Sequence, residues 1–106
     1  MEKSVLTNCG THSDKLVEIY KKIIENKTNN GEILSKNDAW NIESNIYDAY
    51  KTIIAITQDS NVITKSVNYL KLAVEQGGEV SNLSDIAISV VEQSTNELQN
   101  NYNNVN

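Results

Sequence analysis

An apolar stripe between Ala39 and Val74 constrains the fold of this chain more than any other feature of its sequence. Apolar residues recur there at alternating gaps of three and four, and polar Ser60 is the only break in the alternation. Residues three and four apart share one face of an α-helix, so the 39–74 stripe predicts helix on both sides of Ser60. The stripe consists of Ala39, Ile42, Ile46, Ala49, Ile53, Ile56, Ile63, Val67, Leu70 and Val74.

The segment around Ser60 leaves two architectures open. Residues 58–61 are all polar, and three of them are good N-cap residues, which is typical of a tight turn between two helices. The alternative is one helix running to Gln76, about 60 Å long, whose apolar face only another chain could bury. Typical helix lengths favour the turn, and we therefore predict a break at residues 58–61. The two helices would then fold back on each other, and the two halves of the stripe would meet within one molecule.

Further signals divide the rest of the chain into helices. Residues 14–26 form an amphipathic pattern with Ser13 as the expected N-cap, and residues 28–31 end it. Ser35 and Asp38 resemble a capping arrangement before a long helix over residues 36–57. A third helix over residues 62–76 is expected to stop at the Gly77–Gly78 pair, and a fourth to begin near Ser84.

These patterns predict one helical domain over residues 1–106. The chain contains no Pro, which fits uninterrupted helices. The expected fold class is all-α, a small antiparallel bundle of three to four helices with the 36–57 helix at its centre. Residues 1–12 lack a period and are expected to form a loose arm, and the Asn-rich residues 100–106 a flexible tail.

Composition excludes several classes of function. The nine basic residues are all Lys, and the fourteen acids leave the net charge at −5. Nucleic-acid binding needs a basic face, commonly with Arg, so DNA and RNA are not expected partners. No apolar run approaches the ~20 residues of a membrane span, and the N-terminus lacks a signal-peptide pattern. We expect a cytoplasmic protein, although secretion without a signal peptide would leave no trace in the sequence.

The last third of the chain is acidic, since no positive residue follows Lys71. Such a run usually marks a solvated surface, and solubility is the favoured explanation. Recognition of a basic protein partner is the alternative.

Catalytic and metal-binding patterns are weak. Cys9 and His12 have the spacing of metal ligands, but they are the only Cys and His, whereas a closed zinc site needs four ligands. Nucleophilic catalysis at Cys9 would need an oriented base and an oxyanion site, for which the sequence gives no signal. We interpret the pair as a free thiol and a solvated His. We expect no enzymatic activity, catalytic residue, metal site or cofactor.

A second apolar column on the 36–57 helix supplies the candidate binding residues. Trp40, Tyr47 and Ile54 lie seven residues apart beside the stripe, with Tyr50 between the two columns. Trp and Tyr are enriched at protein interfaces, although aromatic residues at helical spacing are more often core, and packing beneath neighbouring helices is the favoured alternative. The leading functional hypothesis is a small protein-binding module of the inhibitor, immunity or adaptor type. The competing hypothesis is a structural subunit that self-associates through the 39–74 stripe.

Overall fold

Residues 5–105 of this chain fold entirely into helices and the turns that connect them. The computed structural model describes the backbone over that range and the side chains of residues 5–100, and it contains no strand there. The predicted all-α class is confirmed. The α-helices are α1 (Ser13–Asn29), α2 (Lys36–Ile56), α3 (Ser60–Glu75) and α4 (Leu83–Val105), and three 3₁₀ turns are η1 (Val5–Asn8), η2 (Gly10–His12) and η3 (Val80–Asn82).

The start of α2 follows the local sequence signal. The Ser35 hydroxyl accepts a hydrogen bond from the Asp38 N–H at 3.1 Å, and the Asp38 carboxylate accepts one from the Ser35 N–H at 2.9 Å. This reciprocal capping box is the arrangement that the sequence predicts. The predicted Ser13 cap of α1 is wrong. Ser13 is already helical, and its hydroxyl accepts a hydrogen bond from the Cys9 N–H at 3.1 Å.

The predicted break between α2 and α3 is confirmed. Thr57 is extended, and the Asp59 side chain caps α3 by accepting a hydrogen bond from the Asn61 N–H at 2.9 Å. Ser60 is thus the first residue of α3. The end of α3 also follows its sequence signal, because Gly77 adopts a φ of +93°.

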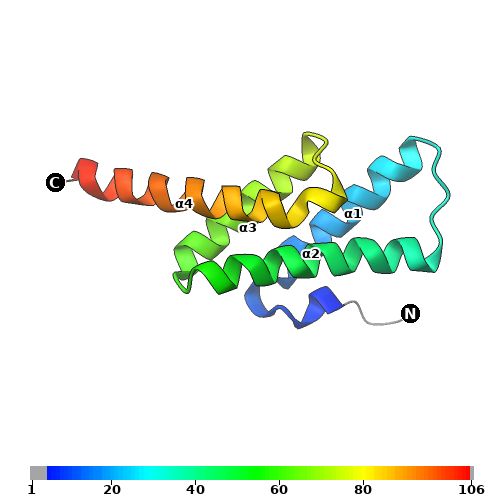
Figure 1. The fold of residues 1–106 in the computed structure, drawn as a ribbon, viewed down its shortest axis with the longest axis horizontal. Coiled ribbons are helices and arrows are strands. Elements are labelled where there is room, and N and C mark those ends of the chain that lie inside the picture. Colours follow the sequence, from blue (N-terminus) through cyan, green and yellow to red (C-terminus); the bar gives the residue numbers. More distant parts are fainter. Residues whose placement is uncertain (1–4, 106) are drawn as a thin grey trace.

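The four helices alternate in direction along the chain, so that α2 and α4 run the same way (Figure 1). Helix α4 packs against α2 and α3, and α1 packs against α3 and α2. Direct contact between α2 and α3 is slight. The two halves of the 39–74 stripe therefore share one core, but α1 and α4 mediate most of their contact, whereas the sequence predicts that the two halves meet directly.

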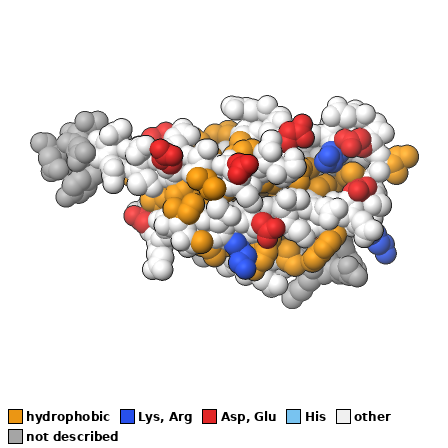
Figure 2. Space-filling view, viewed as in Figure 1, with side chains coloured by type: hydrophobic (Ala, Val, Ile, Leu, Met, Phe, Trp, Pro, Cys, Tyr) orange, Lys and Arg blue, Asp and Glu red, His pale blue; other side chains and the backbone are white. Residues whose placement is uncertain are grey.

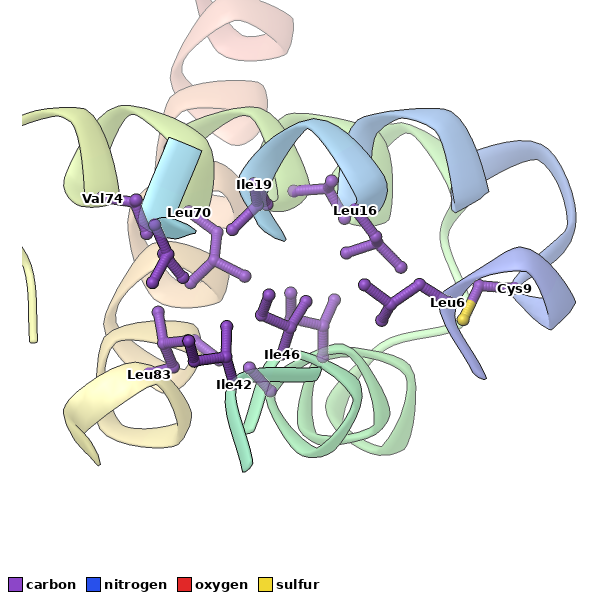
Figure 3. Packing of buried hydrophobic residues seen from close by; sticks show 14 of the residues in the cluster. Leu6, Cys9, Leu16, Ile19, Ile42, Ile46, Leu70, Val74 and Leu83 are labelled. Atoms are coloured by element: carbon purple, nitrogen blue, oxygen red, sulfur yellow. The ribbon is translucent and has the colours of Figure 1, made fainter. Parts of the chain in front are cut away.

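The core collects apolar side chains from all four helices and the first 3₁₀ turn. Figure 3 shows Ile46 of α2 facing Leu16 and Ile19 of α1, while Ile42 of α2, Leu70 of α3 and Leu83 of α4 point into the same core. The stripe supplies its largest share: Ile42, Ile46, Ala49, Ile53, Val67, Leu70 and Val74 are all buried. Ser66 of α3 and Ser94 of α4 are fully buried as well.

The segment at residues 5–12 is not the loose arm that the sequence predicts. Leu6 is fully buried, and Cys9, three residues on, is buried beside it. A 3₁₀ turn places residues three apart on the same side, which explains how a short segment can insert both side chains. Figure 3 shows Leu6 pointing toward Leu16 and the body of the core. Residues 1–4 of the predicted arm lie outside the described residues.

The C-terminal end also differs from the prediction, because α4 continues to Val105 instead of ending near residue 100. Asn lowers helix propensity only modestly, and neither Gly nor Pro interrupts this segment. The distal part of α4 projects beyond the other helices (Figure 1), and the principal extents are 53 × 26 × 19 Å. The radius of gyration is accordingly 14.6 Å, above the roughly 13 Å typical of a chain this long. The side chains of residues 101–106 lie outside the described part.

Candidate binding surface

Helix α2 carries two apolar columns that differ in burial. The inner column consists of Ile42, Ile46, Ala49 and Ile53, which are buried, and the outer column of Trp40, Tyr47 and Ile54. Trp40 is 54% exposed and Ile54 is 39% exposed, while Tyr47 is half-buried against the core. Figure 2 shows hydrophobic side chains in patches among acidic groups on the face viewed there. The expectation that these residues pack beneath neighbouring helices is therefore wrong for Trp40.

The outer column is bordered by charge. The Lys51 ammonium lies 5.6 Å from the centre of the Tyr47 ring, within the range of a cation–π contact. This contact holds a positive group beside an aromatic surface that is itself partly exposed. The outer column thus presents aromatic and aliphatic area on one helix with a cation beside it, and Trp and Tyr are residue types enriched at protein interfaces.

Tyr50 has a different role from the other candidates, because it joins α2 to the N-terminal segment. Its hydroxyl donates to the Cys9 carbonyl oxygen at 3.4 Å and lies 3.3 Å from Nδ1 of His12. The other ring nitrogen of His12, Nε2, lies 3.2 Å from the Thr64 hydroxyl of α3. His12 therefore bridges two helices and is not the solvated side chain that the sequence predicts.

Cys9 and His12 come close together in the fold, but their environment favours a structural role. Burial raises the pKa of the Cys9 thiol, which disfavours the thiolate that nucleophilic chemistry needs. Both nitrogens of His12 already have hydroxyl partners. Within the described residues, no three His, Cys, Asp or Glu side chains gather in a way that could hold a metal ion.

Two acids of the C-terminal third make hydrogen bonds or ion pairs with other side chains. Glu97 of α4 accepts hydrogen bonds from the Tyr69 hydroxyl at 2.6 and 2.8 Å, and lies 3.1 Å from the Lys65 ammonium. The hydrogen bond from Tyr69, with Lys65 beside it, lowers the pKa of the Glu97 carboxyl. Glu75 pairs with Lys71 at 3.7 Å. Glu97 thus joins α4 to α3, and Glu75 pairs with a Lys of its own helix. Because both carboxylates have a Lys partner, they add little to a free acidic surface.

Three acids of the last third make no ion pair within the described residues: Glu79, Asp85 and Glu92. They are exposed. Of the five acids that follow Lys71, these three are therefore available to a basic partner or to solvent.

Sequence reasoning missed one prominent exposed residue. Ile33 lies in the connection between α1 and α2 and is 96% exposed. It belongs to no helical period, so analysis of periodicity passes over it. The available signal was a large aliphatic residue two positions after Gly31, in the segment between two predicted helices.

Comparison with known proteins leaves the candidate surface to be judged on its geometry. No family model, no curated protein and no solved structure matches this chain. No helix within the described residues is both long enough and apolar enough to cross a membrane.

Proposed function

We propose that this chain is a small acidic helical module that binds a protein partner through the outer column of α2 and acts by occupying that partner. The observation that carries the proposal is the exposure of Trp40 on a rigid helix. Trp and Tyr dominate interface hot spots because they supply large contact areas with few rotatable bonds. Tyr47 and Ile54 extend the same surface over about four further helical turns.

The energy available at Trp40 is sufficient for an anchor residue. An aromatic side chain buries 150–250 Å² when it is fully covered, so roughly 100 Å² stays accessible on a Trp that is 54% exposed. At about 25 cal/mol per Å², covering that area would contribute about 2–3 kcal/mol. This value lies in the range that defines interface hot spots. We place the encounter in the cytoplasm, where a buried, unpaired thiol such as Cys9 stays reduced.

The competing hypothesis, self-assembly through the 39–74 stripe, has less support. Seven of the stripe's ten members, including Ile46 and Leu70, are buried inside one molecule, and Ile56 is the only member that is largely exposed, at 52%. The helix break at Thr57–Asp59 also removes the continuous face that a second chain would need. Association of two copies would have to use another surface, such as the outer column itself.

The test compares two exposed hydrophobic positions on different helices. Trp40→Ala removes the proposed anchor, and Leu72→Ala removes a side chain of similar exposure, 46%, from α3. Each full-length variant is immobilised and exposed to lysate of the native host, and the partner retained by the wild type is identified and purified. Its affinity for each variant is then measured by calorimetry.

We expect one stoichiometric protein to bind the wild type, and Trp40→Ala to weaken it about 30-fold, corresponding to roughly 2 kcal/mol. Leu72→Ala should stay within about twofold of the wild type. An equal loss of affinity in the two variants, or an unchanged affinity of Trp40→Ala for the partner, would contradict the proposal. If only this chain is recovered, and light scattering shows an oligomer that Trp40→Ala disperses, the outer column mediates self-association instead.

A further inference from the structure

Two open hollows adjoin at the end of the molecule where α1 turns into α2. They have volumes of about 400 and 440 Å³. One lies between the C-terminal turn of α1 and the segment that follows α3, and the other between that segment and the first turns of α2. Four residues line both hollows and make them one groove: Lys27, Glu32, Glu79 and Val80.

The groove is negatively charged. Lys27 is the only basic residue on its walls, against the acids Glu32, Asp38 and Glu79, so the lining carries a formal charge of −2. Lys27 lies 3.8 Å from the Glu32 carboxylate and is neutralised by it. Glu79 makes no ion pair within the described residues. A ligand with positive charge would thus meet an uncompensated carboxylate in the wall common to both hollows.

Side-chain amides make up much of the remaining wall. Each amide offers both a donor and an acceptor, which is the pairing that an extended backbone needs because its own N–H and C=O groups are unpaired. A helical segment, by contrast, satisfies most of its backbone internally. Asn45 donates to the Asn41 carbonyl oxygen at 2.8 Å, while the other amide side chains have no hydrogen-bond partner among the described residues. The amides belong to Asn26, Asn29, Asn30, Asn41 and Asn45.

The groove also offers some apolar surface to a bound chain. Three of its lining residues, Ile23, Ile42 and Val74, are buried in the core, so this surface comes mainly from Leu34, which is partly buried, and from Ile33. Ile33 lines the second hollow and is almost fully exposed, at 96%. Covering it would remove the largest single exposed aliphatic surface among the described residues from water.

We propose that this groove binds an extended, basic polypeptide segment. A segment of about six residues would span roughly 20 Å at about 3.3 Å per residue, similar to the 19–26 Å width of the molecule. Its cationic side chains approach Glu79 and Asp38, its backbone pairs with the asparagine amides, and an apolar side chain packs on Ile33. This site is separate from the outer column, because Trp40 and Asn41 are consecutive on α2 and point about 100° apart.

The test uses a defined peptide and backbone amide NMR of the full-length protein. The probe is an acetylated, C-terminally amidated hexapeptide of alternating Lys and Leu, and its control replaces each Lys by Glu. We expect the Lys peptide to shift amide signals at residues 26–34 and 77–81, with binding that weakens as salt rises. The Glu peptide should leave these signals unchanged.

Two matched pairs of variants locate the binding. Glu79→Gln should raise the dissociation constant about threefold, as expected for one exposed charge pair, while Glu92→Gln on α4 should leave it unchanged. Ile33→Ser should also weaken binding, whereas Ile88→Ser, which replaces a 50% exposed residue of α4, should not. Circular dichroism verifies that each variant keeps its helix content.

Several results would overturn the assignment. They are shifts spread along α4, equal effects of Glu79→Gln and Glu92→Gln, equal binding of the Glu peptide, or no binding at 5 mM probe. Trp40→Ala serves to separate this site from the proposed function, because it should leave peptide binding intact. Loss of peptide binding in Trp40→Ala would show that the two surfaces are one.

Discussion

The inner and outer columns of α2 look alike in the sequence and differ completely in the fold. Ile46 and Ile53 are fully buried, whereas Trp40 and Ile54 keep 54% and 39% of their surface in water. Both columns are apolar and both repeat with the helical period. What separates them is the position of α1 and α4, which pack over the inner column and leave the outer one partly uncovered. An apolar arc wider than one neighbouring helix can cover therefore signals a surface as well as a core.

The largest effect expected from this comparison is on stability. Ile46→Ala should lower the free energy of unfolding by about 2–5 kcal/mol, because it removes buried methyl and methylene groups and leaves a cavity. Trp40→Ala should lower it by less, about 1–2 kcal/mol, because only about half of the indole is covered in the fold. Urea unfolding followed by circular dichroism measures both. Similar losses in the two variants would mean that the outer column is also structural.

A smaller effect is expected at Tyr50, which lies between the columns. Tyr50→Phe removes the hydroxyl that donates to the Cys9 carbonyl oxygen and contacts His12, and should cost about 1 kcal/mol. Tyr47→Phe is the matched control, since the Tyr47 hydroxyl has no hydrogen-bond partner among the described residues, and it should be neutral. The same urea titrations compare them. A neutral Tyr50→Phe would show that the Tyr50 hydroxyl does not help to hold the N-terminal segment.

The smallest effect is expected where the inner column ends. Ser60→Pro should change stability by less than about 0.5 kcal/mol, because the first helical position tolerates Pro and the preceding Asp59 is already extended. Asn68→Pro, at an exposed position inside α3, should cost about 3 kcal/mol. Thermal unfolding of both variants provides the measurement. A large loss in Ser60→Pro would indicate that helix continues through residue 60 in solution.

Features with a local cause were predictable from the sequence. The Ser35–Asp38 capping box, the break before Ser60 and the stop at Gly77 each depend on residues within one or two turns. The repeating pattern likewise identified the core face of α2. These signals act on the backbone wherever the segment lies in the fold.

Features set by tertiary packing were not predictable in the same way. Leu6 has no periodic apolar partners in its own segment, so its burial depends on where α1 and α2 lie. Ser66 is polar and falls outside the stripe, yet its small side chain is fully buried in α3. The candidate site shows the same limit. The pattern found Trp40, Tyr47 and Ile54, but only the arrangement of helices determines which of them face water.

The burial of Leu6 has a consequence for how the protein is made. Leu6 leaves the ribosome before the whole of α2, yet its 3₁₀ turn packs against both α1 and α2. The nascent chain therefore carries an uncovered leucine until about half of the described residues have been synthesised, and the N-terminal segment can take its place only after the later helices exist. The order in which the core residues are synthesised therefore differs from the order in which they can pack.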